Sequence, residues 1–148
     1  MKKWSSLLLC LLLVLAAAGC GNSGTSNRTD DQSSGVDVDL TALSSTMVYS
    51  EVYNMMTSPE DYIGKTVKMR GTYAVYHDEQ TDKYYFACII KDATACCAQG
   101  IEFELTDDYT YPDDYPEEGG EVCVVGAFDT YKEGSNTYAT LRNAQLSQ

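Results

Sequence analysis

The chain has 148 residues, of which 44% are hydrophobic and 3 are Pro, so it is long enough for one globular domain and is not composed like a disordered protein. Its 22 acidic and 10 basic side chains give a formal charge of -12, which repels phosphate and predicts that nucleic acid is not a partner. With one His, and no HExxH or Ser-His spacing typical of hydrolases, the composition predicts a protein that is not an enzyme.

Residues 1–19 have the pattern of an export signal. Two lysines precede an apolar run at 7–18 that is too short to span a hydrocarbon layer of roughly 30 Å. The run ends in Ala17-Ala18-Gly19-Cys20, which resembles the lipobox of bacterial lipoproteins. This resemblance implies cleavage before Cys20, lipidation of its thiol and anchoring at the extracytoplasmic face of the cell membrane. The alternative is ordinary secretion with Cys20 as a stray thiol.

Residues 20–43 are predicted to form a flexible tether, because the stretch 21–35 has no aliphatic or aromatic side chain. The folded domain is then expected at 44–148. Apolar residues spaced for one helical face open this domain, after capping residues at 44–46. They are Met47, Val48, Val52, Met55 and Met56. They predict a short helix that packs on the end of a sheet, in preference to a Met-rich metal site.

After the helix, a Pro and two acidic residues predict one helical turn at 59–63. Alternating apolar residues and turn residues then predict five strands, which begin at Thr66 and lie near 66–76, 84–91, 101–106, 121–131 and 137–145. Gly71 and Gly126 fall inside the first and fourth strands, where they allow the sheet to curl. Five strands with little helix predict a mainly β fold, a small five-stranded barrel.

The stretch 59–71, PEDYIGKTVKMRG, resembles the opening of OB-like domains in bacterial lipoproteins, where Tyr-x-Gly-Lys leads into a glycine-containing first strand. The resemblance covers roughly residues 58–146 and implies an OB-like barrel. The segment 107–120 departs from that pattern, because its Pro, Tyr and Asp residues disfavour the helix that often lies there. An SH3-like barrel or a small sandwich is the alternative.

Four cysteines remain in the domain, Cys88, Cys96, Cys97 and Cys123, and exported proteins generally keep cysteines that are paired or ligated. They could form two disulfides that staple the loop before the third strand onto the barrel. Alternatively, three or four thiolates could hold Zn²⁺ or Cu⁺, although no other cofactor is expected. Unpaired or redox-active thiols are the third possibility.

The string Cys96-Cys97-Ala98 is similar to the Cys-Cys-Ala signature of a predicted permease-associated family with an extracytoplasmic domain. That similarity implies metal handling linked to a transporter.

The acidic loop at 107–121 has tyrosines between its carboxylates, and it lacks the spacing of a calcium loop. In OB-type barrels, the second and third strands and nearby loops bind ligands. We therefore expect a ligand face with Tyr84, Tyr109, Tyr111 and Tyr115, suited to a cationic or sugar-like ligand. His77 beside Asp78 has no evident nucleophile and is expected to be a solvated turn residue.

Two functions follow from these patterns. The first is a membrane-anchored binding or accessory module without catalysis, which docks to an envelope or transport protein. The second is thiolate-based binding or handling of Zn or Cu, linked to a transporter.

Overall fold

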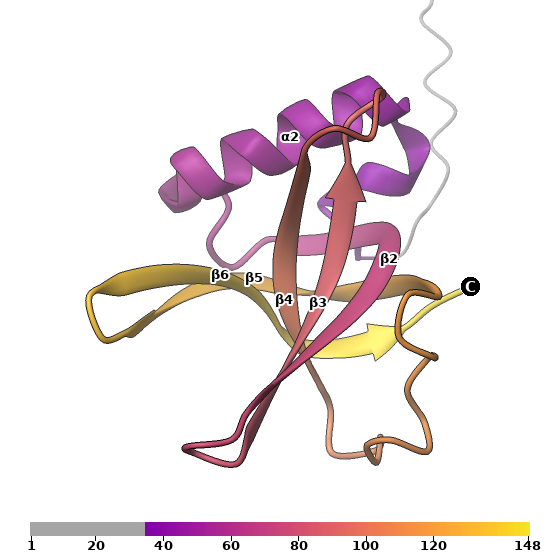
Figure 1. Cartoon of the computed structure of the whole chain (residues 1–148). Helices are drawn as coiled ribbons and strands as arrows, with labels where there is room; N and C mark the ends of the chain where they lie inside the picture. The colour runs from indigo at the N-terminus through magenta and orange to yellow at the C-terminus, as the bar shows by residue number, and fades with distance from the viewer. Residues whose placement is uncertain (1–34) are drawn as a thin grey trace, which may run out of the picture. The chain divides into compact units, whose positions relative to one another are not determined.

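The computed structural model describes residues 35–148, which form one helix, two short 3-10 helices and a six-stranded sheet (Figure 1). The predicted signal, the lipidation site Cys20 and the first part of the tether lie outside the described residues. No helix in the described part of the chain is both long and apolar enough to cross a membrane.

The sheet is mainly antiparallel, and its hydrogen bonds pass through five strands and return to the first. These strands are β2 (Thr66–Asp78), β3 (Lys83–Lys91), β4 (Ala98–Leu105), β6 (Asn136–Leu146) and β5 (Glu121–Glu133). The ring closes because β2 also pairs with β5, and β4–β6 is the parallel pair within it. The predicted mainly β, barrel-like fold with a short N-terminal helix is confirmed.

The ring closes at the middle of β2. Residues 66–72 of β2 pair with β5, whereas 72–78 pair with β3. Gly71 lies at this change of partner, and a Cβ atom there would come within 2.5 Å of the Ile89 carbonyl oxygen. Only glycine lets the two backbones approach so closely, which explains the curl predicted at this position.

The folded unit begins earlier than the predicted boundary at residue 44. Strand β1 (Val38–Asp39) pairs in parallel with β2, and the 3-10 helix η2 (Leu40–Ala42) follows it. Leu40 is buried in the core. Residues 36–43, assigned to the tether from sequence, therefore belong to the described fold. Val36, Val38 and Leu40 alternate with Asp37 and Asp39, which is a short strand pattern, but it directly follows the polar stretch 21–35.

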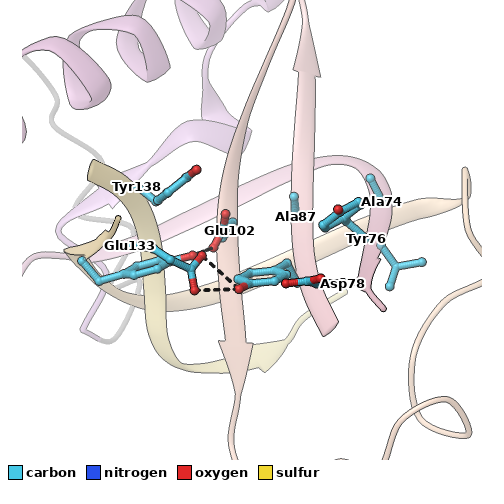
Figure 2. Close-up of a pocket in the computed structure, with 10 residues that line it drawn as sticks. Ala74, Tyr76, Asp78, Ala87, Glu102, Glu133 and Tyr138 are labelled. Atoms are coloured by element: carbon cyan, nitrogen blue, oxygen red, sulfur yellow. Dashed lines mark hydrogen bonds between the residues drawn. The ribbon is translucent and has the colours of Figure 1, made fainter. Parts of the chain in front are cut away.

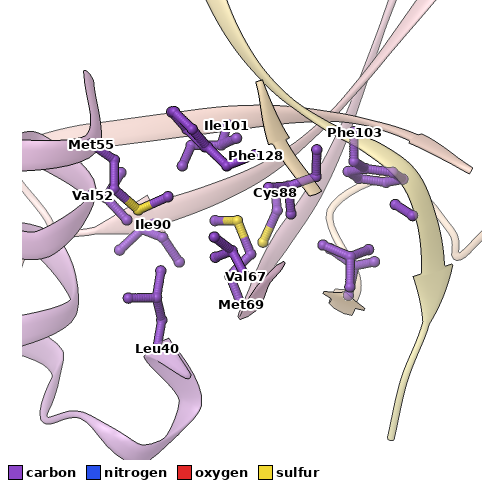
Figure 3. Packing of buried hydrophobic residues seen from close by; sticks show 14 of the residues in the cluster. Leu40, Val52, Met55, Val67, Met69, Cys88, Ile90, Ile101, Phe103 and Phe128 are labelled. Carbon is purple, nitrogen blue, oxygen red and sulfur yellow. The ribbon is translucent and has the colours of Figure 1, made fainter. Parts of the chain in front are cut away.

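Helix α2 (Ser45–Thr57) lies across one end of β3 and β4, as Figure 1 shows. Val52 and Met55 are buried, and Figure 3 shows them directed towards Ile90 and the rest of the core. Met47 and Met56 are exposed, so the buried stripe of the helix is narrower than predicted. The 3-10 helix η3 (Pro59–Asp61) then leads into β2, as expected.

The remaining segment, 106–120, connects β4 to β5 through turns and contains no helix. This absence of a helix was predicted from its composition. The hydrophobic core fills the interior of the ring with side chains from α2, η2 and all five of its strands, the largest being Tyr73, Phe103, Phe128, Leu40, Met55 and Met69.

Candidate ligand-binding groove

A groove of about 270 Å³ lies on the outer face of the sheet, between the β2–β3 hairpin and the β5–β6 hairpin. Its lining residues come from β2, β3, β4, β5 and β6, and Figure 2 shows them around the open space. They are Ala74, Val75, Tyr76, Asp78, Tyr85, Ala87, Glu102, Tyr131, Glu133 and Tyr138. The groove is walled by four tyrosines and contains three carboxylates.

The hollow arises from small side chains at its floor. Ala74 pairs with Ala87 across β2 and β3, and Ala87 pairs with Glu102 across β3 and β4. Side chains alternate between the two faces of a strand, and the neighbours of Glu102, Ile101 and Phe103, point into the core. The two alanines and Glu102 therefore share the outer face, where methyl groups leave room between the taller tyrosines.

Hydrogen bonds between tyrosines and carboxylates join the walls. The Tyr85 hydroxyl donates to both carboxylate oxygens of Glu133, at 2.8 and 2.9 Å, and so connects β3 to the end of β5. The Tyr131 hydroxyl donates to Glu102 Oε2 at 2.6 Å and connects β5 to β4. These contacts fix both carboxylates while leaving each with lone pairs for further donors.

The groove is acidic, with one lysine at its rim. Lys83 Nζ lies 3.5 Å from Glu133 Oε1 and 4.5 Å from the centre of the Tyr85 ring. Partial burial raises the pKa of Glu102, and the hydrogen bond from Tyr131 opposes that rise. Burial and the Glu102 hydrogen bond raise the pKa of Tyr131, so this hydroxyl stays protonated and remains a donor. The arrangement suits ligands that offer ring faces, hydroxyls or ammonium groups.

The four tyrosines predicted as a ligand face lie outside the lining of this groove. Tyr84, Tyr111 and Tyr115 are brought together with Phe86, which we call the aromatic cluster. The Tyr84 and Tyr111 ring centres are 4.9 Å apart, and those of Phe86 and Tyr115 are 4.4 Å apart. Tyr109 lies elsewhere, and its hydroxyl accepts a hydrogen bond from the Leu146 amide.

His77 is a partly exposed residue of the β2–β3 hairpin. Its ring stacks on Tyr84 at 4.2 Å between centres, and Nε2 lies 2.9 Å from Asp82 Oδ1. Asp78, the partner suggested by sequence, instead accepts hydrogen bonds from the Gln80 amide and the Thr81 hydroxyl.

Sequence reasoning missed the residues that line the groove. The alternation of Glu102 with Ile101 and Phe103 already indicated an outward carboxylate, and Tyr85 neighbours the predicted Tyr84 on the opposite face. The missing information was which hairpins meet. The Tyr85–Glu133 contact joins residues 48 positions apart, and no local pattern identifies such a pair.

The four cysteines of the described domain do not converge, and all four are free. Cys88 is buried in the core, as Figure 3 shows, opposite Tyr73. Cys123 pairs with Arg70, three residues from Tyr73 along β2, so it lies on the other face of the sheet. Cys96 and Cys97 are exposed in the β3–β4 loop. The predicted disulfide staple is therefore not formed, and a site with four thiolates is not assembled.

Comparisons with known proteins identify similarity only at the level of structure. No family model matches the chain, and no curated protein matches it. Among solved structures, a proposed nucleic acid-binding lipoprotein from Klebsiella pneumoniae subsp. pneumoniae MGH 78578 is similar, with 20% identity and a TM-score of 0.48. The match covers 80% of this chain and 98% of the Klebsiella chain. A similarity of this size carries no functional conclusion.

Proposed function

We propose that the protein is a membrane-anchored, extracytoplasmic binding module that acts without catalysis. The anchor follows from the lipobox-like sequence that ends at Cys20. The binding role follows from the groove, where carboxylates held by tyrosine hydroxyls face an open space between two hairpins. An envelope or transport protein remains a proposed partner.

The ligand class follows from the groove chemistry. Tyrosine rings provide apolar faces on which a sugar ring can stack, and carboxylates accept hydrogen bonds from hydroxyl or ammonium groups. Asp78, Glu102 and Glu133 together outnumber the nearby Lys83, so an anionic ligand would be repelled. We infer an oligosaccharide that is neutral or carries amino groups.

Calorimetric titration of the full-length protein in detergent tests this proposal with three probes. They are a glucosamine tetramer, an N-acetylglucosamine tetramer and a single-stranded oligothymidylate. We expect both sugars to bind, the cationic one more tightly and with a dependence on salt, and the oligothymidylate not to bind. The net negative charge of the sequence predicts that nucleic acid is not a partner. Preferential binding of the oligothymidylate would therefore overturn both that prediction and the proposed ligand class.

A variant and a matched control locate the binding. Glu133→Gln removes one groove charge, and with it the charge-assisted hydrogen bond to an ammonium group, and should weaken binding of the glucosamine tetramer by about tenfold. Glu60→Gln removes another exposed carboxylate, from η3 and outside the groove lining, and should leave affinity unchanged. An equal loss of affinity in both variants would show that the sugar is attracted by the net charge of the protein and not bound in the groove.

A further inference from the structure

The loop between β3 and β4 places a carboxylate and two thiols together. The Asp92 amide donates to the Cys97 carbonyl at 3.0 Å and closes the base of the loop. The Ala95 amide donates to the Asp92 carbonyl at 3.0 Å, and Ala95 has a φ of 54°, which turns the chain sharply before the cysteines. The Cys96 amide donates to Asp92 Oδ1 at 2.9 Å, so backbone hydrogen bonds hold this carboxylate against the loop.

The three potential ligand atoms lie close to one another. The Sγ atoms of Cys96 and Cys97 are 3.5 Å apart, and Cys96 Sγ is 3.2 Å from Asp92 Oδ2. All three groups lie within 4.8 Å of one another. This spacing arises in a loop in which both cysteines are exposed, so an ion could reach it from solvent.

The distances between these ligand atoms are close to those around a tetrahedrally coordinated metal ion. With Zn–S bonds of about 2.3 Å and a Zn–O bond of about 2.1 Å, two sulfurs lie about 3.8 Å apart, and a sulfur and an oxygen about 3.6 Å apart. The loop approaches this geometry within a few tenths of an ångström for the two pairs measured. Only small side-chain rotations would therefore be needed to surround an ion.

We propose that Asp92, Cys96 and Cys97 bind one thiophilic divalent cation of the zinc class. Binding breaks two S–H bonds, forms two metal–sulfur bonds and releases two protons to solvent, while the Asp92 carboxylate supplies the third ligand. Two sulfur ligands favour such ions over Ca²⁺ or Mg²⁺, which prefer oxygen. Three protein ligands leave the fourth position to water or to a group from a partner, so the site suits exchange of the ion.

This site goes beyond the proposed sugar-binding function and uses none of the groove residues. It also differs from the four-cysteine centre considered from sequence, because Cys88 and Cys123 are buried on different faces of the sheet. A Cys96–Cys97 disulfide would instead require the sulfurs to move from 3.5 Å to about 2.05 Å and an external oxidant to accept two electrons.

Titration of the full-length, reduced protein with Cd²⁺ tests the site, with the ultraviolet sulfur-to-metal charge-transfer band as readout. We expect one Cd²⁺ per chain, two protons released per ion, competition by excess Zn²⁺ and no competition by Ca²⁺. Cys96→Ser and Cys97→Ser should each weaken binding by more than about tenfold, and Asp92→Asn by about tenfold. Cys123→Ser retains the loop and should bind like the unaltered protein.

Three results would overturn the site. They are absence of the band in fully reduced protein, an unchanged Cd²⁺ affinity and band intensity in Cys97→Ser, and an equal loss of affinity in Cys123→Ser. Intact mass with a thiol-free reductant shows that the thiols are free before each titration, and a Cys96–Cys97 disulfide that resists reduction also counts against the site. Circular dichroism of each variant confirms that the exposed loop was changed without unfolding the domain.

Discussion

Tyr131 and Glu102 form a partly buried hydrogen bond of 2.6 Å that joins two strands beneath the groove. An accepting carboxylate makes this contact stronger than a neutral hydrogen bond, although partial exposure reduces its net value. In a double-mutant cycle of Tyr131→Phe and Glu102→Ala, each of which removes one partner of the hydrogen bond, we expect a coupling of about 1 kcal/mol in the free energy of unfolding. Urea unfolding of the four proteins measures it. Strictly additive effects would mean that this bond does not stabilise the groove.

Cys88 provides a test of burial through pH. Burial raises the pKa of its thiol to about 12, with a smaller contribution from the charge of Cys123 on the other face of the sheet. An unfolded thiol has a pKa of about 8.5, so above that pH the unfolded chain binds fewer protons than the native chain. The buried Cys88 thiol therefore makes its full contribution to the free energy of unfolding below about pH 8.5. This contribution is lost as the pH rises towards 12.

Replacing this thiol should make stability less sensitive to alkali. In Cys88→Ala, we expect a smaller fall in the free energy of unfolding between pH 7 and pH 10 than in the unaltered protein, as determined by urea unfolding. Identical pH profiles for Cys88→Ala and the unaltered protein would contradict the burial of Cys88.

At the scale of elements, the local patterns were sufficient to predict the strands but not their partners. The alternation after Thr66 identified β2, and the polar composition of 107–120 identified a connection without helix. Pairing depends on contacts far apart in sequence, which is why the disulfide staple was predicted incorrectly. The ligand face with Tyr84, Tyr109, Tyr111 and Tyr115 stays a prediction. Cys88 and Cys123 carry no local sign of the face that each occupies.

The curl of β2 gives a prediction at this scale. In Gly71→Ala, the new Cβ would lie 2.5 Å from the Ile89 backbone oxygen and 2.9 Å from Cys88 Sγ, so the strands must separate. We expect a loss of about 3 kcal/mol in the free energy of unfolding, measured with urea.

Gly100→Ala is the matched control for this strand substitution. Its Cβ would meet chiefly the flexible end of the Ile89 side chain, at 2.6 Å, which can rotate away. Gly100→Ala should therefore lower the free energy of unfolding by less than Gly71→Ala does. A larger cost at residue 100 would show that the closure of the sheet does not depend on the close approach at Gly71.

At the scale of the whole molecule, the predicted export signal and the predicted lipidation of Cys20 would decide where the groove acts. Both lie outside the described residues, so this prediction rests on the sequence. We expect the unaltered protein to sediment with membranes of the producing cell and Cys20→Ser to lose that association, since a lipidated cysteine supplies the anchor. Immunoblots of membrane and soluble fractions provide the measurement. Unchanged sedimentation of Cys20→Ser would contradict lipid anchoring.

The acidic surface and the two projecting hairpins define the expected ligand. The groove lies where the β2–β3 and β5–β6 hairpins approach the sheet, so each of the five strands of the ring contributes to it. The aromatic cluster around Tyr111 and Tyr115 offers a second surface that a ligand could occupy. These two regions make different predictions about which amides respond to a sugar.

Mapping the glucosamine tetramer by amide chemical-shift changes in isotope-labelled, full-length protein distinguishes the two regions directly. We predict that the largest changes fall on the groove residues Tyr85, Glu102, Tyr131 and Glu133, with smaller changes at Tyr111 and Tyr115. Changes centred on Tyr111 and Tyr115, or none at saturating sugar, would contradict the assignment of the groove as the binding site.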